Sequence, residues 1–215
     1  MGITLHLKPI LASTLEILKQ NPEQVKLFYD SQYLSKSAVN SSLVTSTYAD
    51  QFIDEWETPD LDLHKYYPEM SYLLGGYLEY YSERHLALPE LQSRQDLMQK
   101  DNYMNFLIIE DSEWDGLPLV NAINAGMWIG EEEDYCWYQT PEEVGQILDG
   151  LIWISESGFR SRCRREAELD RLDDWFDWEE AEDMEDCLTD YYKQMVKYYQ
   201  YAARRGNAML GMISC

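Results

Sequence analysis

One apolar stripe in the C-terminal part of the chain constrains the fold more than any other feature. Apolar residues recur at steps of three or four, at positions 175, 178, 181, 184, 188, 191, 195, 199 and 202. This spacing is the period of a helix face that packs against a core. The sequence therefore predicts one long amphipathic helix, which begins near Trp175 and ends at Gly206.

Shorter elements are predicted along the rest of the chain. Residues 3–8 alternate apolar and polar side chains up to Pro9, as a half-buried strand does, and the apolar tail at 208–214 predicts a last strand beside it. The other predicted elements are a helix with capping-box spacing at 13–16 that meets a second helix near Asn21, a loop from 35 followed by a helix at 48–56, a helix at 66–74 that stops at Gly75-Gly76, a helix at 89–100, a strand at 105–109, a helix at 117–124, extended segments at 127–129 and 135–138, and a helix that begins after Thr140 and ends at Gly158.

These elements predict the α+β fold class, mostly helical, with a small mixed or antiparallel sheet and a long C-terminal amphipathic helix. The chain has 215 residues and no internal repeat, so we expect one domain over residues 1–215. The four cysteines show no C-x-x-C spacing, so neither a zinc site nor a disulfide framework is predicted.

The charge balance narrows the classes of partner. Forty acidic residues face 17 Lys and Arg, for a net charge of -23. Nucleic acids and anionic membranes attract basic surfaces, so neither is an expected partner, and a basic protein is favoured. No stretch has the length of a transmembrane helix and the start lacks the pattern of a secretory signal, so we expect a cytoplasmic protein.

The excess charge is concentrated at the start of the predicted long helix. Between Glu166 and Asp190 there are 13 acidic residues and one base, Arg171. Four like-charged i,i+4 pairs in this stretch would cost roughly 1 to 2 kcal/mol in total. The stretch is interpreted either as a solubilising helix face or as a surface for a basic partner. The candidate partner-binding residues are Asp173, Asp174, Asp177, Glu180 and Asp183.

A second hypothesis from a different class is a small-molecule-binding or catalytic pocket. Its candidate residues, which are aromatic apart from one lysine, are Lys65, Tyr67, Tyr135, Trp137 and Tyr138. No phosphate-binding loop, dinucleotide fingerprint or nucleophile elbow occurs, and no cofactor or metal is predicted. A nucleophilic role for Cys136 or Cys163 would need a nearby base. The sequence therefore favours a non-enzymatic protein.

Several short segments, in this order along the chain, resemble the YfbM-like family, a set of bacterial domains of unknown function (domain of unknown function 1877). The matching segments are Met1-Gly2-Ile3, Asn21-Pro22-Glu23, Leu61-Asp62-Leu63 with Lys65, Leu73-Leu74, Pro118-Leu119 with Ala122, Ile129-Gly130, Tyr138, Thr140-Pro141-Glu142-Glu143-Val144, Tyr198-Tyr199 and Gly206-Asn207-Ala208. The resemblance covers nearly the whole chain. It implies a single α+β domain and brings no established activity.

The chain departs from the family pattern at two places. Tyr66-Tyr67-Pro68 follows Lys65 where the family tends to carry a tryptophan and a histidine, and residues 135–138 replace a longer stretch that contains glycine, proline and arginine. A family ligand pocket built from those groups would be changed in this member. The leading hypothesis is therefore a cytoplasmic module that binds a protein, in the manner of an acidic immunity-type inhibitor of a basic effector, with the aromatic pocket as the alternative.

Overall fold

A computed structural model of the chain describes residues 4–25, 28, 55, 58, 60–78, 86–92, 106–130, 136–168 and 181–214. Its main sheet has five antiparallel strands in the order β2-β1-β9-β8-β7. The strands are β1 (Thr4–Ile10), β2 (Leu61–Asp62), β7 (Met127–Trp128), β8 (Cys136–Gln139) and β9 (Ala208–Ser214). Two two-stranded pairs lie outside this sheet: β3 (Tyr77–Leu78) with β4 (Leu86–Ala87), and β5 (Ile108–Ile109) with β6 (Leu119–Val120).

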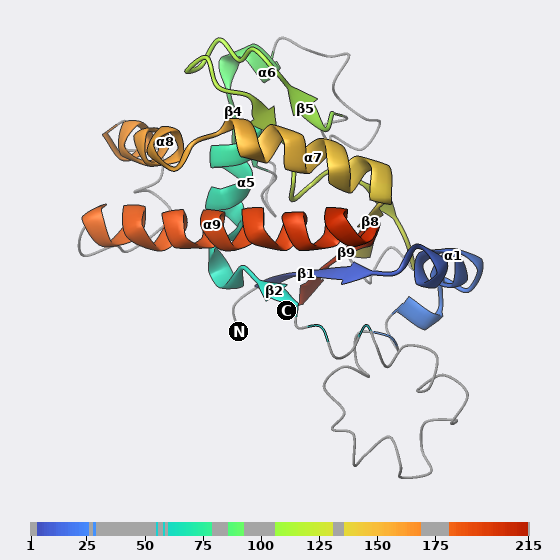
Figure 1. The fold of residues 1–215 in the computed structure, drawn as a ribbon. Coiled ribbons are helices and arrows are strands. Elements are labelled where there is room, and N and C mark those ends of the chain that lie inside the picture. Colours follow the sequence, from blue (N-terminus) through green and yellow to red (C-terminus); the bar gives the residue numbers. More distant parts are fainter. Residues whose placement is uncertain are drawn as a thin grey trace.

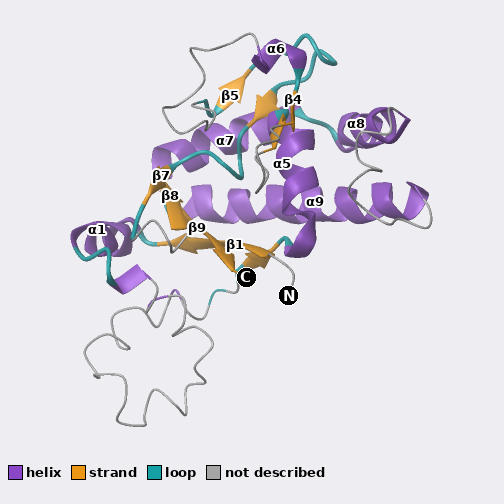
Figure 2. Cartoon of the chain, turned by 180° about the vertical axis from the view of Figure 1, so that it is seen from behind, coloured by secondary structure: helices purple, strands orange, loops and turns teal. Residues whose placement is uncertain are grey.

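The helices pack on both sides of the main sheet. They are α1 (Ala12–Gln20), the 3-10 turn η1 (His64–Tyr66), α5 (Tyr67–Gly75), α6 (Pro89–Gln92), α7 (Pro141–Trp153), α8 (Glu156–Glu168) and α9 (Ala181–Arg205). In Figure 1 the long helix α9 lies between the sheet and α7. Helix α1 lies at the right, beyond the end of β1. Figure 2 shows the same layers from behind, with α5 crossing α9. The α+β fold class is confirmed, and the sheet is antiparallel.

The alternation of β1 separates two cores. Leu5 and Leu7 belong to the larger core, which contains the buried side chains of α5, α7 and α9. Ile10 belongs to the smaller core, which contains Leu15 and Leu18 of α1. Successive side chains of a strand point to opposite faces, so one strand supplies both cores. The sheet is therefore buried on both sides in its centre.

The long C-terminal helix is confirmed from residue 181 onward. Its fully buried stripe contains Met184, Leu188, Tyr192, Met195, Tyr199 and Ala202, at the predicted steps of three or four. Gly206, with φ of 65°, follows the last helical residue and takes the left-handed conformation that ends many helices. The chain then enters β9, which pairs with β1 over its whole length, as the sequence predicted.

Two further helix boundaries agree with the sequence. Helix α7 begins with the predicted capping box, in which Thr140 Oγ1 accepts from the Glu143 amide and the Glu143 carboxylate accepts from the Thr140 amide. Helix α5 ends before Gly76, which has φ of 69°. The extended segments at 127–129 and 135–138 correspond to β7 and β8. Of the predicted helix at 48–56 only Glu55 is described, and it is helical; the ends of the helices predicted to follow Asn21 and to reach Lys100 lie outside the described residues.

Three predictions about helices are wrong, and groups distant in sequence decide two of them. The segment 117–124 is not helical but contains β6, because β5 pairs with it. Helix α7 ends at Trp153, and Gly158 lies inside α8. The capping box at 13–16 does not form, since α1 begins after Leu11, whose amide donates to Glu55 Oε1 at 3.4 Å.

The first strand is longer than predicted and passes through a proline. The Leu63 amide donates to the Leu5 carbonyl, so the backbone groups of Leu5, Leu7 and Pro9 face the β2 side of β1. Pairing with β2 is confined to His6 and Leu7. The backbone nitrogen of Pro9 therefore faces away from β9, so the missing N–H removes no hydrogen bond between β1 and β9. The strand continues to Ile10.

Candidate functional site

The structure describes one of the five candidate acidic residues, and it lies at the start of α9. Asp183 lies in the first turn of this helix, and Asp173, Asp174, Asp177 and Glu180 lie outside the described residues. At the start of the acidic stretch Glu166 is buried and accepts from the Tyr72 hydroxyl, and the side-chain contacts of the acids on α9 begin at Glu185. These contacts show how far the chain neutralises its own carboxylates.

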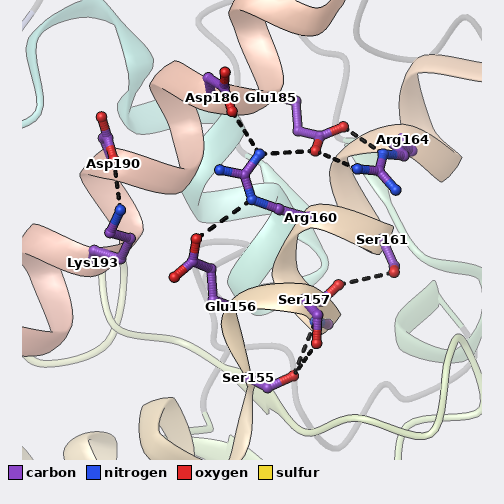
Figure 3. Close-up of polar contacts among 11 residues, drawn as sticks. Ser155, Glu156, Ser157, Arg160, Ser161, Arg164, Glu185, Asp186, Asp190 and Lys193 are labelled. Atoms are coloured by element: carbon purple, nitrogen blue, oxygen red, sulfur yellow. Dashed lines mark hydrogen bonds and ion pairs between the residues drawn. The ribbon is translucent and has the colours of Figure 1, made fainter.

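Helices α8 and α9 are joined by a cluster of acids and bases, shown in Figure 3. Glu185 accepts from Arg160 at 3.0 Å and from Arg164 Nε and an Arg164 terminal nitrogen at 2.6 and 2.8 Å. Arg160 also reaches Asp186 at 2.6 Å and Glu156 at 3.5 Å. We call these five residues the α8–α9 charge cluster. It fixes the start of α9 against α8.

Hydrogen bonds within the charge cluster shift the pKa values of Glu185 and Arg160. The hydrogen bond from Arg164 lowers the pKa of Glu185, and the bond from Arg160 adds to this against a smaller opposing effect of burial. The hydrogen bonds that Arg160 donates to Asp186 and then to Glu185 raise the pKa of Arg160. Further along the helix, the hydrogen bond from Lys193 at 2.9 Å lowers the pKa of Asp190. Asp186 and Asp190 nevertheless have side chains that are 73% and 66% exposed, so their outer faces remain open to solvent.

Arg162 is a functional-looking side chain that sequence reasoning missed, and its role is structural. It is the largest of the fully buried side chains that the structure describes and forms a two-pronged ion pair with Asp115 at 2.6 and 3.0 Å. Its guanidinium also donates to the backbone carbonyls of Leu73, Leu117 and Pro118. The available signal was its place beside Phe159 and Cys163 on the buried stripe of α8, with Glu166 one turn later.

The residues of the predicted aromatic pocket are not all brought together. Trp137 belongs to the larger core and Tyr138 to the smaller one, since neighbouring residues of β8 point to opposite faces of the sheet. Tyr67, at the start of α5, packs against the larger core, Lys65 lies in η1, and Tyr135 lies outside the described residues.

The side chains of Trp137 and Tyr138 on β8 contact other side chains of the fold. The ring centroids of Trp137 and Trp128 are 6.0 Å apart, and the Tyr138 hydroxyl donates to the Met127 sulfur at 3.4 Å. Two cavities, of about 250 Å³ between α6 and α8 and about 540 Å³ between α9 and β2, are lined by other residues. An aromatic pocket at 135–138 therefore has no support in the placement of its described members.

A buried polar group near the sheet edge also escaped the sequence analysis. His6 Nδ1 and Asp60 Oδ2 are 2.7 Å apart, and His6 Nε2 lies 3.1 Å from Thr4 Oγ1. The nearly fully buried Lys8 donates to the Thr58 carbonyl at 2.6 Å. The hydrogen bond to Asp60 raises the pKa of His6 despite desolvation. Desolvation alone would raise the pKa of Asp60, yet its hydrogen bonds and the charges of His6 and Lys8 together lower it.

Metal binding and thiol chemistry find little support among the described side chains. In this part of the chain, no group of three or more His, Cys, Asp or Glu is arranged to hold a metal ion. Cys136 and Cys163 are buried free thiols, and desolvation raises the pKa of Cys163 to about 12. Cys163 therefore stays protonated at neutral pH and is a poor nucleophile. Across the described helices, none has both the length and the apolar character needed to cross a membrane.

The chain is similar to a known protein family and to a solved structure. A family described as "Domain of unknown function (DUF1877)" matches residues 1–212. Among solved structures, the chain is similar to "The Crystal Structure of a Protein of Unknown Function YfbM from Escherichia coli", with 12% sequence identity and a TM-score of 0.48. That similarity covers 98% of this chain and 99% of the other. No curated protein matches the chain significantly.

Proposed function

We propose that this chain, which belongs to the YfbM-like DUF1877 family, is a non-enzymatic module that binds a basic protein through an acidic surface. The proposed contact residues are Asp173, Asp174, Asp177, Glu180 and Asp183. Family membership agrees with the resemblance noted from the sequence and carries no activity with it. Inhibition of a basic effector, as immunity proteins achieve it, is the form of binding that we favour.

The proposal rests on one observation: the arginine side chains of α8 already have partners within the fold. Arg160 and Arg164 bind Glu185, and Arg162 is buried against Asp115. The fourth, Arg165, donates to the Trp114 carbonyl. The nearest run of bases before residues 169–180 therefore already has partners among the described residues. Residues 169–180 contain six acids and only one base.

A basic partner would relieve an unfavourable charge distribution. Like charges at i,i+4 positions of a helix repel by about 0.2 to 0.5 kcal/mol per pair, and a helix N-terminus resembles only about half a positive charge. Cationic side chains of a partner would lower this repulsion and would be steered towards the acidic surface over long range. The exposed outer faces of Asp186 and Asp190 extend the same charge along α9.

A matched pair of variants tests this proposal. In the first, the five proposed contact residues are replaced by Asn or Gln. In the second, the same number of exposed acids outside the stretch is neutralised, namely Glu23, Glu110, Asp111, Glu142 and Asp149. Proteins captured from a lysate of the native source are identified, purified and titrated against wild type and both variants at about 50 and 300 mM salt.

We expect a basic partner that binds wild type and the second variant alike and binds the first variant much more weakly. The affinity for wild type should fall as salt rises, because exposed charges are screened. Equal binding of that partner to both variants, or binding that salt does not change, would show that the acidic stretch only solubilises the protein.

A further inference from the structure

The cavity of about 540 Å³ lies between α9 and the segment that leads into β2. One wall contains Asp60 and Leu61, and the other contains Lys197, Tyr198 and Tyr201 of α9. This volume falls within the range of small-molecule sites, roughly 300 to 1,000 Å³. The cavity is separate from the acidic stretch and shares no residue with the aromatic pocket expected from the sequence.

The two walls carry opposite charges that do not pair with each other. Asp60 is ionised at neutral pH because His6 and Lys8 lower its pKa, and its Oδ2 is the atom that meets His6. Lys197 is exposed on the facing helix. Among the described residues no ion pair joins Asp60 and Lys197, although both line the cavity. A ligand that carries both signs could satisfy the two walls at once.

The cavity lining also contains aromatic and aliphatic side chains. Leu61 is nearly buried, and burial raises the pKa of the Tyr198 hydroxyl, so this side chain stays neutral. Tyr201 is held by Arg205, whose guanidinium lies 4.8 Å from the ring centroid and donates to the hydroxyl at 3.0 Å. These side chains offer a fixed apolar surface of the kind that lines ligand sites.

The acid-free sequence of the helix wall also favours this location. From Tyr191 to Asn207 the chain contains four bases and no acidic residue, in a protein with a net charge of -23. Lys193 is paired with Asp190, whereas Lys197 has no hydrogen bond or ion pair within the described residues. Lys197 is thus the cation of this wall that is open to an incoming carboxylate.

We propose that the cavity binds a small zwitterion with an apolar or aromatic side chain, which is the chemical class of the amino acids. Its ammonium group would lie at Asp60, its carboxylate at Lys197 and its side chain against Leu61, Tyr198 and Tyr201. The Asp60 side chain is 20% exposed beside its pair with His6, so it can accept the ammonium as well, and neither a pure cation nor a pure anion would satisfy both walls. This inference does not depend on the proposed acidic binding surface.

Titration calorimetry with single amino acids tests the inference on the intact protein. The probes are the twenty L-amino acids at millimolar concentration, followed by L-phenylalanine against phenethylamine, which lacks the carboxylate, and phenylpropionate, which lacks the ammonium. We expect an apolar or aromatic amino acid to bind and each single-charge analogue to bind about tenfold more weakly or worse, because one charged hydrogen bond is lost.

Variants assign the two charges to residues. Lys197→Met should weaken L-phenylalanine by about tenfold and leave phenethylamine unchanged, because only the carboxylate contact is removed. Lys193→Met is the matched control, since Lys193 lies about one helical turn away and is not among the described residues that line the cavity. Asp60→Asn should weaken L-phenylalanine and leave phenylpropionate unchanged.

Three results would overturn the inference: no binding by any of the twenty amino acids, equal binding of L-phenylalanine and phenethylamine, or full binding by Lys197→Met. The variant with five neutralised acids should bind amino acids like wild type. Failure of the cavity to bind therefore leaves the proposed protein-binding function standing, and loss of partner binding leaves the cavity standing.

Discussion

Gly211 on β9 lies directly against the indole ring of Trp137, its register partner on β8. A Cβ atom added at Gly211 would lie 2.6 Å from Cζ2 and 2.9 Å from Nε1 of that ring. Trp137 is therefore a packing side chain between two strands, and Gly211 provides the space for it.

We expect Gly211→Ala to lower the free energy of unfolding by about 1 to 3 kcal/mol, because the new methyl group overlaps a buried ring. Urea denaturation followed by circular dichroism measures the change. Gly145→Ala is the control with the opposite sign, since its added Cβ meets nothing within 4 Å on α7. Alanine is the better helix former, by up to about 1 kcal/mol. An unchanged Gly211→Ala protein would mean that Trp137 does not occupy this position.

Arg162→Met should be the most destabilising of the arginine substitutions in α8. It leaves the Asp115 carboxylate and three backbone carbonyls without their donor in the interior. Removing one partner of a buried ion pair costs about 3 to 5 kcal/mol. Arg164→Met removes an arginine whose side chain is 64% exposed, so we expect a loss below about 1 kcal/mol. Equal losses measured by chemical denaturation would contradict the buried role of Arg162.

The pair formed by His6 and Asp60 should make stability depend on pH. Because the fold raises the pKa of His6, this contribution is fully present below the unfolded value of 6.5 and is lost as pH rises through the folded value. The fold lowers the pKa of Asp60, so its contribution is present above 3.8 and is lost as pH falls. The stability difference between wild type and His6→Gln should therefore be largest from about pH 4.5 to 6.5 and smaller at about pH 8.5.

Denaturation curves at these pH values check the difference. His64→Gln is the matched control, because its side chain is more than half exposed and its ion pair among the described residues is with the nearby Asp62 at 3.1 Å. We expect that variant to differ little from wild type at each pH. A His6→Gln difference that stayed constant across the range would show that the ion pair does not form.

Thr140→Ala should destabilise the protein by about 1 kcal/mol through loss of the N-cap of α7. The threonine hydroxyl accepts from the Glu143 amide, which would otherwise lack an intrahelical partner. Thr140→Ser retains the hydroxyl and should keep most of this stability. Thermal unfolding of the three proteins separates the cap from other roles of residue 140, and an alanine variant as stable as wild type would rule the cap out.

The sequence by itself determined those elements whose sequence patterns lie within the element or at its ends. The capping box and proline after Thr140, the left-handed glycine at Gly76 and the stripe of α9 each specify a boundary or a buried face from neighbouring residues. The alternation of β1 and the apolar tail likewise predicted the strand pair that closes the sheet. The concentration of negative charge before α9 was also readable directly.

Only the tertiary structure decided the features that depend on groups far apart in sequence. Arg162 donates to the carbonyl of Leu117, 45 residues away. Strand β5 pairs with β6, so the segment 117–124 contains a strand although its local pattern indicated a helix. The carboxylate of Glu55 accepts a hydrogen bond from the amide of Leu11, where the sequence predicted a local cap. Such bonds stabilise a backbone conformation that neighbouring residues do not encode.

The same distinction applies to the candidate sites. The sequence located the acidic residues, but the fold selected Arg160 and Arg164 as the partners of Glu185. The fold also placed Asp60 opposite Lys197, across a cavity that no sequence pattern indicated. Local periodicity determines which face of an element is buried, whereas the packing of distant elements determines which charges meet, because complementary groups can come from any part of the chain.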